Sequence, residues 1–212
     1  MTPIITKAEQ YVEELAVALV GLDTAQLELL SWLLAETYMD GKTVFVCGNG
    51  GSAATASHLA TDLTKLTTPP DAERRLKCMA LTESASTITA VGNDLSYDDI
   101  FVEQLRVWMN PGDMVLGIST SGSSPNVLRA IDYANQNGAF TVGITGSNGH
   151  ELRRLARKTV VIGSTNVQRI EDLSLIVAHL LVLLTKDVCF AALASGATTV
   201  DAATRQLGNE AA

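Results

Sequence analysis

The spacing of apolar positions changes along the chain, from a helical period near the N-terminus to short continuous runs further on. Apolar residues recur every three or four positions from Lys7 to Val20 and from Thr24 to Tyr38, which predicts two helices. Gly21 and Gly41 follow these stretches and would end them. The later runs are β-rich and mostly separated by helix-like segments: Thr43 to Cys47, Leu76 to Leu81, Met114 to Ile118, Phe140 to Ile144, and Thr159 to Ile162. Strands that are apolar throughout are buried on both faces, so the pattern predicts a doubly wound, three-layer α/β domain with about five parallel strands.

Composition and charge narrow the class of protein. The 212 residues are 47% hydrophobic and 18% charged, and no linker separates two cores, which predicts one domain. The formal net charge is −8, so we expect no direct binding of DNA or RNA. Met1 to Gln10 lacks the apolar core of a signal peptide, and the apolar run Leu173 to Leu184 is shorter than the roughly 20 residues of a membrane span. We expect this run to be a buried helix and the protein to have no membrane partner.

The cysteines indicate a reducing compartment. Cys47, Cys78 and Cys189 are odd in number and widely spaced, and none belongs to a C-x-x-C pair. This usage favours reduced thiols in a cytoplasmic protein.

The first candidate ligand-binding loop runs from Gly48 to Ser52, between a strand and a helix that we expect to begin near Ala53. Glycines let a backbone approach an anion closely, and the N–H groups at a helix start attract negative charge. The alternative interpretation of this sequence is a tight turn that binds no ligand. The loop also fits the G-x-G-x-x-A dinucleotide fingerprint, but the acid expected about 20 residues on is replaced by Thr68, and the nearest acid at a strand end is Glu83. A nicotinamide-dependent enzyme is therefore the least favoured interpretation, and we expect no nucleotide cofactor.

The second candidate loop runs from Ser119 to Ser124 and carries five hydroxyl groups around one glycine. Ser124 and Pro125 would be the N-cap and the first residue of the next helix. Hydroxyls and amides at a helix N-terminus suit a small phosphate monoester, whereas the Gly-Lys-Ser/Thr end of a Walker loop is absent. The loop therefore predicts a phosphate site and disfavours nucleoside triphosphate hydrolysis. A polar loop with ordinary helix caps is the alternative.

Three groups of residues follow one another in a recognisable order. They are Gly48 to Ser52 with Ala53, Ala54 and His58; Val91 to Asp94 with Asp98 to Phe101; and Gly117 to Ser124. Together they resemble the sugar isomerase (SIS) domain and, within that family, the phosphoheptose isomerases, over about Tyr11 to Asp187. The resemblance implies a flavodoxin-like fold and an aldose-ketose isomerase that converts sedoheptulose 7-phosphate to a heptose 7-phosphate through an enediol. The single domain would consist of two N-terminal helices for oligomerisation in residues 1–41 and an α/β core in residues 42–187. The Ala/Thr-rich tail 188–212 has no counterpart in the family.

The resemblance also implies roles for individual residues. Ser52, Ser119, Ser121 and Ser124 would surround the phosphate, and Asn49, Asp94 and Thr120 would contact sugar hydroxyls. The substrate site would further include Gly50, Gly51, Asn93 and Glu171. A zinc ion would be held by His58, Asp62, Glu171 and His179, with Asp62 as the catalytic base and His179 as the acid.

Helix geometry supports part of this ligand set. His58 and Asp62 are spaced i, i+4 and would share one face of a helix. Glu171 and His179 are eight residues apart, about 12 Å and roughly 80° on a regular helix, which is near the limit for two ligands of one ion. Without a metal, His179 would be a core histidine, and His58 with Asp62 an ordinary surface pair.

Three positions depart from the family pattern. Asp62 stands where the family has glutamate, Gln168 where it has aspartate, and Glu171 where it has glutamine. The departures keep a second interpretation open, in which the chain is a SIS-domain regulator or adaptor that binds a phosphosugar without converting it.

Assembly is expected as well, because related isomerases are homotetramers with sites built between subunits. The two N-terminal helices carry more apolar side chains than one sheet face needs: Leu15, Val17, Leu19, Leu27, Leu29, Leu30, Trp32, Leu33 and Leu34. Exposed apolar surface of this extent is typical of an interface.

Overall fold

The computed structural model describes residues 4–195. Its helices are α1 (Ile4–Val20), α2 (Thr24–Met39), α3 (Gly51–Leu66), α4 (Ala85–Asp94), α5 (Val102–Trp108), α6 (Pro125–Gln136), α7 (His150–Leu155) and α8 (Val167–Ala194), with a 3₁₀ turn, η1, at Tyr97–Asp99. Its strands are β1 (Thr43–Gly48), β2 (Lys77–Ala80), β3 (Met114–Ile118), β4 (Phe140–Gly146) and β5 (Lys158–Ile162). Each of the five strands and both N-terminal helices lies where the apolar pattern places it. Helix α3 begins two residues before the expected Ala53.

The five strands form one parallel sheet in the order β2-β1-β3-β4-β5. Strand β1 therefore has β2 on one side and β3 on the other, so the chain changes direction across the sheet between β1 and β3. In parallel sheets, ligands bind outside the carboxyl ends of the strands at such a switch point. The loops that follow β1 and β3 are the two candidate loops of the sequence.

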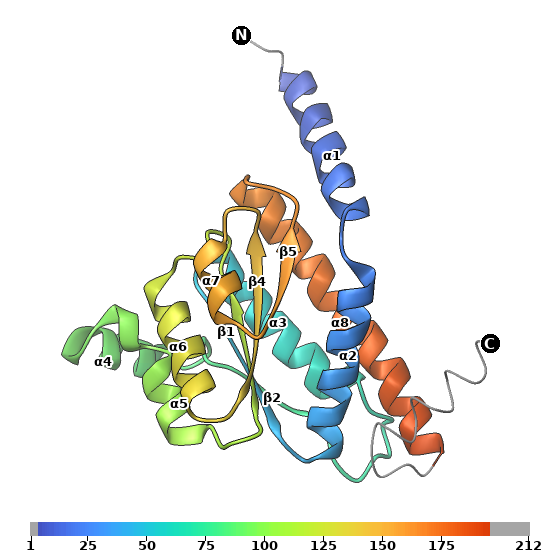
Figure 1. Cartoon of the computed structure of the whole chain (residues 1–212), viewed down its shortest axis with the longest axis vertical. Helices are drawn as coiled ribbons and strands as arrows, with labels where there is room; N and C mark the ends of the chain where they lie inside the picture. Colours follow the sequence, from blue (N-terminus) through green and yellow to red (C-terminus); the bar gives the residue numbers. More distant parts are fainter. Residues whose placement is uncertain (1–3, 196–212) are drawn as a thin grey trace.

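Helices cover both faces of the sheet, which confirms the three layers (Figure 1). Val44 and Val46 of β1 face the layer of α2, α3 and α8, while Phe45 and Cys47 face the layer of α5, α6 and α7. This alternation explains why β1 is nearly continuously apolar, since each face of its pleat is a core. The outer strands β2 and β5 begin instead with the exposed Lys77 and Lys158.

Helix α8 is the longest element, with 28 residues. By length and composition it could cross a membrane, and 44% of its most apolar window is buried inside the protein. Its buried side chains, among them Leu173, Val177 and Leu181, belong to the core shared with α2 and α3. We interpret α8 as a core helix, in line with the sequence.

Helix α1 stands out from the body of the protein (Figure 1). Two polar contacts join it to the start of α8: Tyr11 donates a hydrogen bond to Asp172, and Arg169 forms an ion pair with Glu14. The bond to Asp172 raises the pKa of Tyr11 above its ordinary value. These contacts fix α1 beside the first turn of α8.

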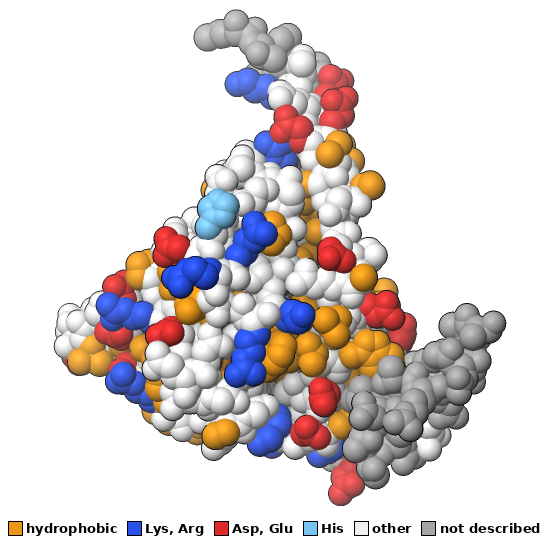
Figure 2. Space-filling view, viewed as in Figure 1, with side chains coloured by type: hydrophobic (Ala, Val, Ile, Leu, Met, Phe, Trp, Pro, Cys, Tyr) orange, Lys and Arg blue, Asp and Glu red, His pale blue; other side chains and the backbone are white. Residues whose placement is uncertain are grey.

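The apolar side chains of the N-terminal helices divide into two groups. Leu27, Leu30 and Leu34 are buried in the chain's own core, so part of the surplus expected from the sequence is used within the fold. Val17 and Val20 of α1 remain 75% and 86% exposed, and Figure 2 shows apolar side chains along the lower part of this helix. The remaining exposed surface is therefore concentrated on α1.

Candidate functional site

The glycine loop after β1 depends on close packing. A Cβ on Gly48 would lie 2.9 Å from the Cβ of Ser52, so only glycine leaves room for this serine. Gly50 has a φ of +54° and is the N-cap of α3, a conformation that favours glycine. The loop thus turns directly into the N-terminus of a 16-residue helix, where anions are stabilised.

The hydroxyl loop after β3 is tied together by its own serines. The Oγ atoms of Ser119 and Ser124 lie 3.0 Å apart, and the N–H of Gly122 donates to Ser119 Oγ at 3.1 Å. Ser124 is the N-cap of α6 and Pro125 its first residue, as the sequence predicts. Ser124 makes no side-chain cap bond, however, because its hydroxyl faces Ser119. The hydroxyls are therefore gathered at the start of α6, on the side where an anion would sit.

The end of β4, the start of α7 and the turn between them hold the hydroxyl loop in place. The N–H of Gly146 donates to the carbonyl of Thr120 at 3.2 Å, and the N–H of Leu152 to the carbonyl of Gly122 at 3.0 Å. Gly122 has a φ of +65°, and a Cβ there would lie 2.4 Å from the Cα of Gly149. Two glycine backbones are thus in contact, which fixes the loop by packing as well as by hydrogen bonds.

A pair of amides joins the two loops. Asn49 of the glycine loop and Asn126 of α6 exchange hydrogen bonds of 2.9 and 2.8 Å, and the Tyr97 hydroxyl donates to Asn49 Oδ1 at 3.1 Å. The sequence predicts a role for Asn49 but none for Asn126 or Tyr97. Asn126 carries a weak signal, since a side-chain acceptor in the first turn of a helix can satisfy a free N–H; Tyr97 carries none.

The acidic and imidazole candidates also meet. Nε2 of His58 lies 3.2 Å from Oδ2 of Asp62 and 3.2 Å from Nε2 of His179. His179 is exposed, so it is not a core histidine. The contact depends on the packing of α3 against α8, which run side by side in the same direction: the carboxyl of Glu171 lies against Gly51 at one level, and His179 against His58 two turns further on.

The donor set fits a metal ion. One ligand atom each from His58, Asp62 and His179 lie within 4.8 Å of one another. Donors of a tetrahedral zinc site with ordinary bond lengths are about 3.3 Å apart, close to the two spacings of 3.2 Å seen here. Glu171 is not part of this group, because its carboxyl lies against Gly51 at the N-terminus of α3.

The remaining expected residues lie at the edges of the site. Asn93 and Asp94 end α4 and are exposed, and the Asn93 amide donates to the Asp94 carboxylate at 2.7 Å. Gln168 is exposed in the first turn of α8. Ser121 is exposed, whereas Ser52 and Ser119 are buried in their loops. The two loops are therefore joined by direct hydrogen bonds, whereas Asn93, Asp94 and Gln168 lie at the surface.

A family comparison agrees with this arrangement. Residues 9–146, which include both loops, match the family described as the SIS domain. The chain belongs to the SIS domain family.

Three relatives of this SIS domain are described as phosphoheptose isomerases. The chain is 40% identical to a phosphoheptose isomerase of Aliarcobacter butzleri over 72% of its own length and 80% of the relative. It is 37% identical to a phosphoheptose isomerase of Aquifex aeolicus over 82% of its length and 91% of the relative. The solved phosphoheptose isomerase of Neisseria gonorrhoeae superposes with a TM-score of 0.80 at 26% identity, over 88% of this chain and 100% of that chain.

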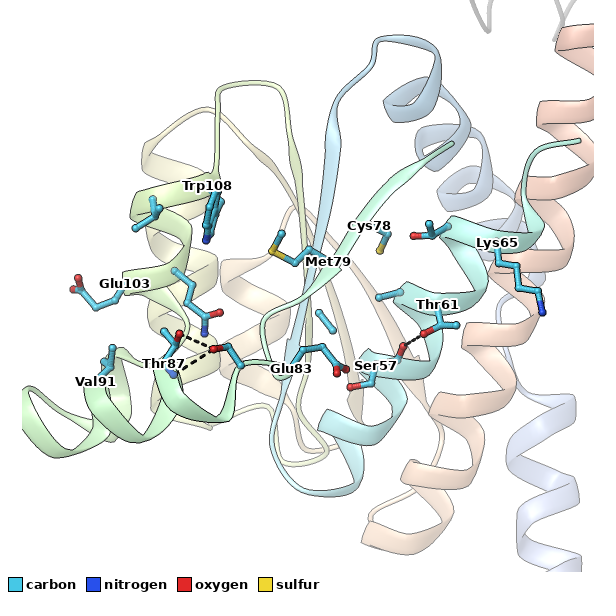
Figure 3. Close-up of a pocket in the computed structure, with 16 residues that line it drawn as sticks. Ser57, Thr61, Lys65, Cys78, Met79, Glu83, Thr87, Val91, Glu103 and Trp108 are labelled. Carbon is cyan, nitrogen blue, oxygen red and sulfur yellow. Dashed lines mark hydrogen bonds between the residues drawn. The ribbon is translucent and has the colours of Figure 1, made fainter. Parts of the chain in front are cut away.

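A separate groove of about 1050 Å³ lies beside the edge strand of the SIS domain (Figure 3). Its walls come from α3, β2, α4 and α5, and they include Ser57, Thr61, Met79 and Trp108. Ser57 and Thr61 are the sequence neighbours of His58 and Asp62, so α3 presents adjacent faces to the groove and to the imidazole cluster. The residues that line the groove include none from the two loops.

Proposed function

We propose that the protein is an aldose-ketose isomerase that converts sedoheptulose 7-phosphate to a heptose 7-phosphate. The relatives described as phosphoheptose isomerases, which this chain covers over most of their length, support the substrate. The observation that carries the chemistry is the His58–Asp62–His179 cluster, which lies along the same pair of helices as the glycine loop and Glu171.

The phosphate is bound, in this proposal, where the two loops and two helix N-termini converge. Ser52, Ser119, Ser121 and Ser124 supply hydroxyl donors, and α3 and α6 supply partial positive charge. Neither loop contains lysine or arginine. A site of this type can stabilise a phosphate monoester by hydrogen bonds and helix dipoles without an ion pair.

The sugar then extends from the loops along α3 and α8. Seven residues separate Gly51 from His58, which corresponds to about 10 Å along a helix. An extended sugar chain can cover this distance, with its phosphate at the loops and its carbonyl end at the cluster. The sugar contacts proposed along this path are Asn49, Gly50, Gly51, Thr120 and Glu171, with Asn93 and Asp94 approaching from α4.

Asp62 and His179 are the proposed acid-base pair. Asp62 removes the proton from the carbon next to the carbonyl while His179 donates a proton to the carbonyl oxygen, and an enediol forms. His179 then takes the hydroxyl proton of the adjacent carbon as Asp62 returns its proton to the former carbonyl carbon, which completes the isomerisation. Such transfers require both groups within hydrogen-bond reach of the bound sugar. The shorter aspartate, in place of the family glutamate, requires the sugar to lie closer to α3.

His58, Asp62 and His179 are also the proposed ligands of a zinc ion. When bound, such an ion polarises a substrate oxygen and stabilises the developing negative charge. Glu171 remains a predicted fourth ligand, and a change in its side-chain position would be needed for it to join the other three.

We propose that the protein is a homotetramer and that it is located in the cytoplasm. The exposed apolar side chains of α1 support an interface, and Tyr11 and Glu14 connect that helix to the start of α8, within two residues of Glu171. Assembly through α1 would therefore act close to the site.

Turnover of sedoheptulose 7-phosphate by the purified protein, with added zinc and after chelation, tests this function. Asp62→Asn and His179→Ala are expected to abolish conversion, while His150→Ala, which removes the remaining histidine on α7, should retain it. Binding of the phosphosugar without conversion by the wild type would support the regulator or adaptor instead, with Asp62, Gln168 and Glu171 as its distinguishing residues.

A further inference from the structure

Asn126 is a buried amide placed between the two loops. It is 1% exposed, in the first turn of α6, and its side chain makes three hydrogen bonds. Oδ1 accepts from the N–H of Val127 and from Asn49 Nδ2, both at 2.9 Å, and Nδ2 donates to Asn49 Oδ1 at 2.8 Å. A buried amide that is satisfied in this way resists rotation, because turning it would leave polar atoms unpaired.

The backbone of α6 sets the direction of every bond in this network. The N–H of Val127 can only donate, so the atom of Asn126 that faces it must be the oxygen. Asn126 Nδ2 is therefore directed at Asn49, and the atom of Asn49 that it meets must also be an oxygen. One helix N–H thus fixes the orientation of an amide in the other loop.

Tyr97 strengthens the same orientation from a third segment. Its hydroxyl donates to Asn49 Oδ1, so that oxygen accepts two hydrogen bonds. The turn that carries Tyr97 is attached to α6 as well, because Arg129 pairs with Asp99 at 2.6 Å and with Asp98 at 3.3 Å. Helix α6 therefore holds both partners of the Asn49 oxygen.

The side chain of Asn49 has one hydrogen-bond donor left for a ligand. An amide has two N–H donors, and Asn126 Oδ1 takes one of them. The oxygen is already occupied by two donors. In this state Asn49 can offer a bound sugar a hydrogen-bond donor and not an acceptor.

We propose that Asn126, with Tyr97, is a positioning residue that holds Asn49 as an obligatory donor to an acceptor oxygen of the phosphosugar. The inference rests on the proposed function, since it assigns the polarity of one sugar contact within that site. Asn126, and not the N-cap residue Ser124, accepts a hydrogen bond from an N–H in the first turn of α6, because the hydroxyl of Ser124 is turned to Ser119.

Asn126→Asp is the sharpest test. The carboxylate keeps both acceptor bonds and replaces the donor to Asn49 Oδ1 by a second acceptor, which opposes the present orientation of Asn49. A negative charge in the first turn of a helix is favourable, so the fold should persist. We expect the Kd for sedoheptulose 7-phosphate, measured by calorimetry, to rise about tenfold, as for the loss of one buried hydrogen bond. KM should rise in parallel with little change in kcat, because the contact is made in ground and transition states alike.

A matched control lies on the same helix. Asn135 accepts a hydrogen bond from Thr141 and donates one to the carbonyl of Leu155, far along α6 from the loops. Asn135→Asp therefore removes one donor from a comparable amide and should leave Kd unchanged. Tyr97→Phe, which removes the other donor to Asn49, should raise Kd in the same direction as Asn126→Asp.

A double-mutant cycle separates positioning from a general structural effect. In an Asn49→Ala background, Asn126→Asp should raise Kd less than in the wild type, because the part of its action that passes through Asn49 is already lost and only repulsion between the new carboxylate and the phosphate remains. Additive effects, or an unchanged Kd in folded Asn126→Asp, would overturn the inference. A wild type that binds the phosphosugar without converting it would refute the proposed function and leave this test intact, whereas a wild type that does not bind it would refute both.

Discussion

The Nε2 atoms of His58 and His179 lie 3.2 Å apart, although 121 residues separate them in the chain. Both rings project from long helices whose positions are fixed by the core, so the contact does not depend on a loop. Two imidazole nitrogens that face each other can share one proton or one metal ion. The pair is therefore the point at which the proposed chemistry can be examined most directly.

Metal binding should depend on this pair. We expect the wild type to retain one zinc ion per chain in equilibrium dialysis, and His58→Ala to lower its affinity for zinc at least tenfold because one of three ligands is lost. His150→Ala is the control, since that residue begins α7 and is outside the cluster. Equal zinc retention by His58→Ala and the wild type would contradict the assignment.

The contact between Gly122 and Gly149 should be intolerant of a methyl group. A Cβ on Gly149 would lie 2.0 Å from Thr145 Oγ1, so Gly149→Ala must displace the segment that supports the hydroxyl loop. We expect the free energy of unfolding to fall by about 1–3 kcal/mol, as for overpacking elsewhere, with a higher KM for the phosphosugar. Urea unfolding and steady-state kinetics measure the two effects.

Gly163→Ala provides the comparison for that substitution. A Cβ on Gly163 would meet no atom within 4 Å, so stability and KM should stay close to those of the wild type. Equal behaviour of the two alanine variants would mean that the glycine contact does not determine the position of the hydroxyl loop.

The sheet could be predicted from sequence because each strand is mostly apolar, the inner strands on both faces, and is followed by a loop with glycine or polar residues. The glycines and polar residues that follow β1 and β3 also located both ligand loops. The family resemblance implied that His58 and His179 lie together, but the spacing of residues along the chain could not predict it, since the contact depends on α3 and α8 packing in the same direction. Asn126 was missed for a different reason: its sequence context is that of any residue in the first turn of a helix, and its role arises only when Asn49 is brought to it.

The buried cysteines should be chemically silent in the folded protein. Burial raises the pKa of Cys47 and Cys189 to about 12, so almost no reactive thiolate is present at neutral pH. We expect a thiol reagent such as Ellman's to react with them at pH 8 only after unfolding. Rapid reaction in the native protein, measured by absorbance and mapped by mass spectrometry, would contradict their burial.

The same thiols predict a dependence of stability on pH. Their pKa in the unfolded chain is the ordinary 9.0, below the folded value of about 12, so the unfolded state loses these protons first. Their contribution is therefore complete below pH 9.0 and declines as the pH rises toward 12. Cys47→Ser and Cys189→Ser, compared by urea unfolding at pH 7 and pH 10, should show less of this decline than the wild type.

The exposed valines of α1 should determine the oligomeric state. Val17→Asp or Val20→Asp places a charge on side chains that are 75% and 86% exposed in the single chain. If α1 is an interface, either change should lower the mass measured by light scattering during size-exclusion chromatography. Glu13→Gln alters the charge of the same helix without changing its apolar surface, and it should leave the mass unchanged.

No side chain of α4 is fully buried, although Ile88 and Val91 are partly buried against the core. The helix stands away from the sheet (Figure 1), and the Ser84 side chain caps its start. A helix with so little packing is free to fluctuate relative to the core. Any sugar that contacts Asn93 or Asp94 must therefore also immobilise α4, and the lost conformational entropy reduces the net affinity. A phosphate held by the hydroxyl loop alone incurs no such cost, so the two ends of one substrate would bind with different thermodynamic signatures.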